Sequence, residues 1–239
     1  MGETEGGHSS EVPLSLSHYL HLQLIGYLGL LLPFILFGLA ATRPIPDLPR
    51  WDALSSVSAY YYSGAVAVFT GVLVALSLFL FTYRGYSKSW ADRFFGKVGG
   101  VAALGVAVFP TGAPENLTEP LWWREWVRTV HYVSAFTLFL VFIVFSVWLF
   151  RRSDVPRSEQ TGAKRRKNNL FLGCGLVMIG AVVWAGSSVV SHQPIFRPEV
   201  IALWAFAMSW LVKGEVYNPI LQRLQTAKDF IRQVGPSET

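Results

Sequence analysis

Two histidines lie at the ends of long apolar segments, each within reach of other polar side chains. Arg128, His131 and Ser134 are spaced i, i+3 and i+6, so they share one face of a helix. Ser188 and His192 are four residues apart and share a helix face in the same way. Imidazole groups bind metal ions and transfer protons near neutral pH. If the two segments lie side by side, these residues form one polar site.

More polar residues fall at the same ends of the apolar segments. Together they make a candidate ligand-binding set of eight residues: Tyr60, Tyr61, Thr111, Arg128, His131, Ser188, His192 and Glu199. The set has three interpretations, namely a metal or enzymatic site, a pocket for a lipid headgroup or small ligand, and ordinary hydrogen bonds between helix ends. No HExxH or HxxxH pattern occurs, so no metal or other cofactor is predicted. A bound metal is expected only at His131 and His192.

Six apolar segments must position these residues. The chain has 239 residues, of which 52% are hydrophobic and only 15% charged, well below the roughly 25% of soluble domains. No Asp, Glu, Lys or Arg lies in the middle of any segment, which is typical of membrane helices. We therefore predict an all-α, polytopic integral membrane protein with a six-helix transmembrane bundle. The predicted spans are Tyr19–Ala41, Ala59–Phe81, Phe94–Thr111, Val127–Phe150, Asn169–Ser191 and Pro198–Val212.

The basic residues predict how the bundle is oriented. Residues 83–97, 151–168 and 213–239 together hold fifteen of the 20 Lys and Arg residues, and six spans place all three segments on one side. The positive-inside rule makes that side cytoplasmic. The prediction is a multi-pass protein of the inner membrane with both termini inside. It consists of a tail at 1–17, a transmembrane domain at 18–213 and a second tail at 214–239.

Basic residues on the inner side also predict contacts with lipid headgroups. The candidates are Arg84, Arg165, Arg166 and Lys213. Clusters of this kind attract anionic lipid. The alternatives are a plain topology signal for the run at 164–167 and a clamp between helix ends, such as Arg84 with Glu215. Nucleic acid is not predicted as a partner.

Glycines indicate how the helices pack. Gly96 and Gly100 have GxxxG spacing, which lets two helix backbones approach closely. Packing within the chain and a homo-oligomer interface are both compatible with this motif.

Soluble-enzyme signatures are absent from the sequence: it contains no GxSxG, Walker A, GxGxxG or CxxC pattern. The uncharged segment centres argue against an ion-coupled transporter. The favoured hypothesis is therefore a non-enzymatic membrane protein that binds lipid or serves as an accessory subunit of a membrane complex. One alternative is a membrane-embedded lipid hydrolase or transferase that uses His131 and His192. Another is a transporter of a small solute.

Four stretches carry a family resemblance: Ser56–Tyr86, VAVFPT at Val106–Thr111, HYVSAFTLFL at His131–Leu140 and LWAFAMSWLVKGE at Leu203–Glu215. Through them the chain resembles a group of uncharacterised bacterial six-span membrane proteins and, more remotely, the DRAM/Frag-type six-span membrane proteins. The resemblance covers about residues 20–215. It implies six helices and a bacterial inner membrane, and it assigns no catalytic residue.

Overall fold

The structure, a computed structural model, describes residues 12–42, 51–85, 89–114, 117–152 and 161–215, and these residues form helices joined by turns and loops, with no strand among them. These residues form six α-helices and two short 3-10 helices (η): α1 (Val12–Thr42), η1 (Ser58–Tyr62), α2 (Val66–Thr82), α3 (Trp90–Val108), α4 (Glu125–Val147), η2 (Leu149–Arg151), α5 (Gly162–Val190) and α6 (Phe196–Lys213). The prediction of an all-helical chain is confirmed for these residues.

Three of the helical stretches are long and apolar enough to cross a membrane. They are Tyr19–Thr42 in α1, Glu125–Arg151 from α4 to η2, and all of α5. Helix α2 is also apolar but has 17 residues. These helices indicate a membrane protein.

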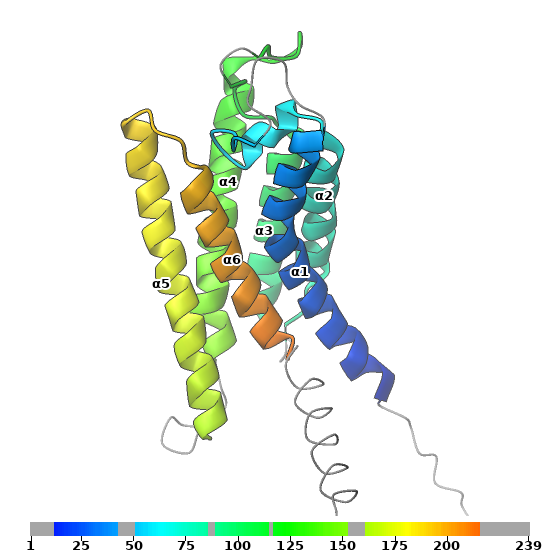
Figure 1. Ribbon diagram of the computed structural model, residues 1–239. Coiled ribbons are helices and arrows are strands. Elements are labelled where there is room, and N and C mark those ends of the chain that lie inside the picture. The colour runs from blue at the N-terminus through cyan, green and yellow to red at the C-terminus, as the bar shows by residue number, and fades with distance from the viewer. Residues whose placement is uncertain (1–11, 43–50, 86–88, 115–116, 153–160, 216–239) are drawn as a thin grey trace, which may run out of the picture.

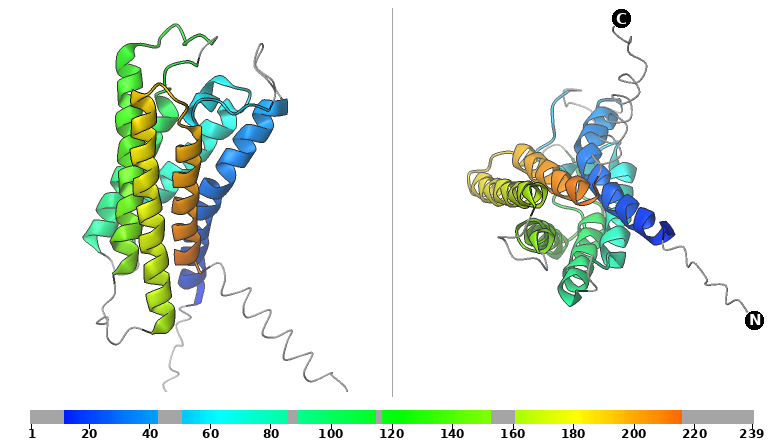
Figure 2. Two further views of the ribbon diagram at one scale, coloured as in Figure 1. Left: turned by 60° about the vertical axis from the view of Figure 1, so that its left-hand side comes forward. Right: turned by 90° about the horizontal axis from the view of Figure 1, so that it is seen from below.

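Consecutive α-helices run in opposite directions and form one elongated bundle (Figures 1 and 2). Helix α5 lies at one edge, against α4 and α6, while α1 packs on α6 and α2. We call the end of the bundle where α5 begins and α6 finishes the basic end, after residues 164–167. The other end carries η1 and the exposed Trp51, Trp122 and Trp126, and we call it the Trp end.

The helix starts that differ most from the sequence prediction are those of α1, α2 and α5. Helix α1 begins at Val12, so part of the predicted tail 1–17 is helical, while 1–11 and 216–239 lie outside the described residues. Helix α2 starts only at Val66, because Ser63 is extended and its hydroxyl bonds the Tyr60 carbonyl and the Ala65 amide. Helix α5 starts at Gly162, capped by the Thr161 hydroxyl, so residues 164–167 are helical instead of forming a loop.

The GxxxG glycines pack α3 against α2. A Cβ at Gly96 would lie 2.7 Å from the Leu80 carbonyl oxygen, and one at Gly100 would lie 2.9 Å from that of Ser77. The buried Ser77 hydroxyl donates to the Gly100 carbonyl at 2.7 Å. The motif therefore serves packing within the chain, where only a glycine permits this approach.

Candidate functional site

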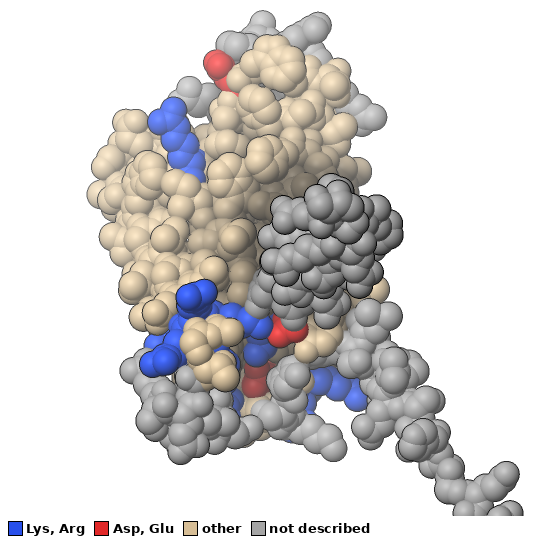
Figure 3. Space-filling model, turned by 60° about the horizontal axis from the view of Figure 1, so that its bottom comes forward, with Lys and Arg blue, Asp and Glu red and all other residues tan. Residues whose placement is uncertain are grey.

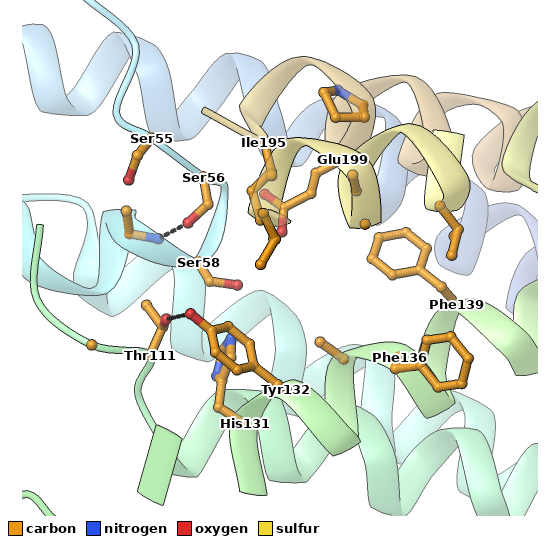
Figure 4. A pocket seen from close by; sticks show the side chains of 18 of the residues that line it. Ser55, Ser56, Ser58, Thr111, His131, Tyr132, Phe136, Phe139, Ile195 and Glu199 are labelled. Atoms are coloured by element: carbon orange, nitrogen blue, oxygen red, sulfur yellow. Dashed lines mark hydrogen bonds between the residues drawn. The ribbon is translucent and has the colours of Figure 1, made fainter. Parts of the chain in front are cut away.

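A cavity of about 650 Å³ lies at the Trp end, between α4, α5 and α6 (Figure 4). The rest of its wall comes from η1 and the segment leading into it, from the segment that follows α3 and from the turn between α5 and α6. Its polar lining comprises Ser55, Ser56, Ser58, Thr111, Arg128, His131, Tyr132, Gln193 and Glu199. The volume is in the range of roughly 300–1,000 Å³ that is usual for small-molecule sites.

Glu199 fastens the segment before η1 to the first turn of α6. Its Oε2 accepts a hydrogen bond from the backbone N–H of Val57 at 2.6 Å. The Ser55 carbonyl accepts two more, from the N–H groups of Ile195 at 2.7 Å and Phe196 at 3.0 Å. These three bonds hold one side of the cavity in place, and the Glu199 side chain extends along it toward Ser56 (Figure 4).

His131 lies in the α4 wall with only 2% of its surface exposed. Its Nδ1 is 2.7 Å from the carbonyl oxygen of Phe109, which can only accept a hydrogen bond. Nδ1 therefore carries the hydrogen, and Nε2 of the neutral ring is an acceptor. Among the described residues this is the one hydrogen bond that His131 makes, so the imidazole is not joined to a hydroxyl nucleophile there.

Two tyrosines anchor the segment that follows α3. The Tyr62 hydroxyl donates to the Thr111 carbonyl at 2.6 Å, and the Thr111 hydroxyl donates to the Tyr132 oxygen at 3.4 Å. Burial, followed by the negative charge of Glu119, raises the pKa of Tyr62 to about 12. The Tyr62 hydroxyl therefore stays protonated at neutral pH and keeps its donor role.

Arg128 provides a positive charge at the rim of the cavity. Its guanidinium forms a salt bridge with Glu125 one turn away, and its central carbon lies 5.9 Å from the centre of the Trp123 ring. Nearly half of the Arg128 side chain remains exposed. Because Glu125 and Glu199 are both close to this end, the rim does not present a strong net positive charge.

Below the polar end the cavity becomes apolar. Its wall there comes from α4, α5 and α6: Ala135, Phe136, Phe139, Ala181, Val182, Ala185 and Ala202. Phe136 is 60% exposed and Val189 is 55% exposed, so the cavity is open at the surface between α4 and α5. The site thus has a polar end near the Trp end of the bundle and an apolar groove that runs along the helices.

The structure brings together four of the eight candidate residues, Thr111, Arg128, His131 and Glu199. The other four lie outside the cavity lining. Tyr60 is fully buried and packs against Phe196, with ring centres 5.9 Å apart, whereas Tyr61 is half-buried and packs on Tyr62. Ser188 is buried, and His192 is exposed in the turn after α5.

The two histidines therefore occupy different surroundings. His131 lines the cavity, while His192 sits in a left-handed backbone conformation, with φ of 55°, outside it. No group of three or more His, Cys, Asp or Glu side chains suited to a metal ion occurs among the residues that the structure describes.

At the basic end, Arg84, Arg165 and Arg166 are exposed and Lys213 is half-buried. Glu215, which the sequence paired with Arg84, forms its salt bridge with Lys167 at 2.9 Å.

Comparisons of the chain with protein-family models, with curated proteins and with solved structures found no match. Functional assignment therefore depends on the geometry of the cavity.

Sequence reasoning missed Tyr132, Ser56 and the whole apolar groove. Helical spacing contained a signal for part of it, because Arg128, Tyr132, Ala135 and Phe139 follow one another on one face of α4. The wall that α5 contributes has no such signal, because its residues are apolar on every side of the helix.

Proposed function

We propose that this protein binds a membrane amphiphile, with the polar headgroup at the Trp end of the cavity and an acyl chain in the groove between α4 and α5. The change from polar to apolar lining along a single cavity is the observation that carries this proposal. A lipid has the same sequence of polarity, with a polar headgroup followed by an apolar acyl chain. The opening beside Phe136 and Val189 provides a route for a chain to enter from the bilayer.

The proposal includes six membrane spans. Helices α2, α3 and α6 have 17, 19 and 18 residues. At about 1.5 Å per residue they are roughly 26–29 Å long, close to the hydrocarbon thickness of about 30 Å. The charge distribution then puts the basic end in the cytoplasm and the amphiphile site in the outer leaflet.

The lining favours a headgroup that both donates and accepts hydrogen bonds. Acceptors are the Glu199 carboxylate and His131 Nε2, while Arg128 and the Ser and Tyr hydroxyls supply donors. Because the charges at the rim nearly balance, an uncharged or zwitterionic headgroup suits the site better than a strongly anionic one. Phosphatidylethanolamine, whose ammonium group donates hydrogen bonds, is a suitable probe.

Two glycines of α5 offer a matched test. A Cβ at either Gly186 or Gly180 would meet open space, but only Gly186 lines the cavity. Leucine at position 186 therefore adds its side chain to the cavity from a site where the Cβ has room, while leucine at position 180 adds the same volume outside the cavity. Binding of phosphatidylethanolamine by the full-length protein is measured by titration with native mass spectrometry.

We expect Gly186→Leu to abolish saturable binding of phosphatidylethanolamine and Gly180→Leu to keep it. Phosphatidylcholine, whose headgroup nitrogen carries no hydrogen, is expected to bind more weakly than phosphatidylethanolamine to the unchanged protein. Equal binding by the two leucine variants would reject the cavity as the amphiphile site.

A further inference from the structure

The first turns of α5 carry four consecutive basic residues whose side chains point in different directions. Successive residues of a helix are about 100° apart, so residues 164–167 surround the axis. Lys164 and Lys167 are half-buried and face the neighbouring helices, whereas Arg165 and Arg166 are exposed. The run thus has an inner pair of ammonium groups and an outer pair of guanidinium groups.

The inner pair meets polar and charged groups from the segment after η2 and from the end of α6. Lys167 bonds Glu215 at 2.9 Å, and Lys164 donates to the Arg152 carbonyl at 3.4 Å. Lys213 lies within electrostatic reach of both lysines, with its Nζ 5.4 Å from the centre of the Phe150 ring. Three ammonium groups therefore converge where α5 begins and α6 ends.

Among the described residues of this end, positive charge exceeds negative charge. Two described carboxylates, Asp92 and Glu215, lie among the basic groups, and each already has a basic neighbour in a salt bridge. Figure 3 shows the described basic side chains gathered here, with smaller patches of acidic surface beside them. The described basic residues around the end of η2, the start of α5 and the end of α6 are Arg151, Arg152, Lys164, Arg165, Arg166, Lys167 and Lys213. An anion bound beside them reduces their mutual repulsion.

The surroundings of the cluster place it beside lipid. Trp148 is 49% exposed, and the Arg152 guanidinium lies 5.5 Å from the centre of its ring, as expected where a helix leaves the hydrocarbon. On α5 the exposed apolar surface resumes within a few turns, with Leu176 57% and Val177 47% exposed. A ligand with both a phosphate group and an acyl chain matches this arrangement, and a soluble anion would use only half of it.

We propose that the basic end of α5 and α6 binds the phosphate group of an anionic membrane lipid. Arg165 and Arg166 supply guanidinium forks that bond phosphate oxygens in pairs, and Lys164, Lys167 and Lys213 supply the attracting field behind them. The acyl chain lies along the exposed side of α5. This site is at the opposite end of the bundle from the amphiphile cavity. Its test does not depend on whether the cavity binds an amphiphile.

The test compares two pairs of exposed arginines at opposite ends of the bundle. One variant combines Arg165→Gln with Arg166→Gln, and its control combines Arg124→Gln with Arg197→Gln, which removes the same charge at the Trp end. Native mass spectrometry of the full-length protein gives the ratio of the dissociation constants of phosphatidylcholine and phosphatidylglycerol. Exposed substitutions of this kind seldom disturb folding, and size-exclusion chromatography checks that they do not.

We expect the unchanged protein to bind phosphatidylglycerol more tightly than phosphatidylcholine. In the 165/166 variant the ratio of the two dissociation constants should fall by roughly 30-fold, because each basic residue near an anionic lipid contributes about 1 kcal/mol. The control variant is expected to keep the preference. Equal losses in both variants would show a response to net charge alone and overturn the site. Displacement of the lipid by sn-glycerol 3-phosphate, beyond that caused by sodium chloride of equal ionic strength, would overturn it in favour of a soluble phosphate.

Discussion

Replacing Glu199 by alanine is expected to loosen the attachment of the segment before η1 to α6. The carboxylate accepts the Val57 N–H at 2.6 Å, and Val57 is 5% exposed, so water does not readily replace the lost acceptor. Glutamine keeps a carbonyl oxygen at nearly the same place. Glu199→Gln therefore retains a neutral hydrogen bond and serves as the matched control.

The magnitude follows from the type of bond. A buried donor left without a partner costs about 1–3 kcal/mol. Since about 1.4 kcal/mol corresponds to a factor of ten, Glu199→Ala raises the equilibrium for local opening of this segment roughly 5- to 150-fold. The two bonds to the Ser55 carbonyl remain, so the effect stays local.

Hydrogen–deuterium exchange of the peptide covering residues 51–62 measures this opening. The Glu199→Ala protein should exchange the Val57 amide faster by that factor, the glutamine variant should fall between it and the natural chain, and peptides of α2 and α3 should be unchanged. If the alanine variant protects Val57 as well as the natural chain does, Glu199 does not hold the cavity wall and the reasoning fails.

Three further outcomes are expected, each measured as the free energy of reversible unfolding in mixed micelles. Gly96→Ala should lower the free energy of unfolding by about 1–3 kcal/mol, because the added methyl meets a backbone carbonyl of α2. Gly180→Ala should not lower it, and equal losses in the two variants would contradict the close α2–α3 packing. The fully buried hydroxyls of Ser146 and Ser209, 2.8 Å apart, should show a coupling of ~0.6 kcal/mol in a double-mutant cycle, and strictly additive losses would deny the bond. Gly85→Ala should cost at least about 1 kcal/mol, since φ at this residue is 72°, and unchanged stability would show that the turn adjusts.

The sequence predicted the helical class well because hydropathy acts over whole segments. Lys and Arg distribution also anticipated that residues 164–167 and Lys213 lie at one end of the bundle. On α4, helical spacing correctly grouped Arg128 and His131, because two residues three apart on one helix need no knowledge of the rest of the fold. It wrongly added Ser134, which lies outside the cavity lining and faces Gly105 of α3.

The remaining features depend on contacts between distant segments. The start of α2 moved to Val66 because Ser63 forms local hydrogen bonds that compete with the helix, and apolar composition does not reveal such bonds. His192 shares helical spacing with Ser188, yet α5 ends at Val190 and the turn carries His192 out of the cavity. Glu199 meets Val57 across 142 residues of sequence, a pairing that no local pattern encodes.

The most direct test of the amphiphile site is a density map of the protein in nanodiscs that contain phosphatidylethanolamine. We predict lipid density with its headgroup between Arg128 and Glu199 and a chain that follows α4 past Phe139. A map in which the cavity is closed by its own side chains, with ordered lipid only on the outer surface of the bundle, would contradict the proposal.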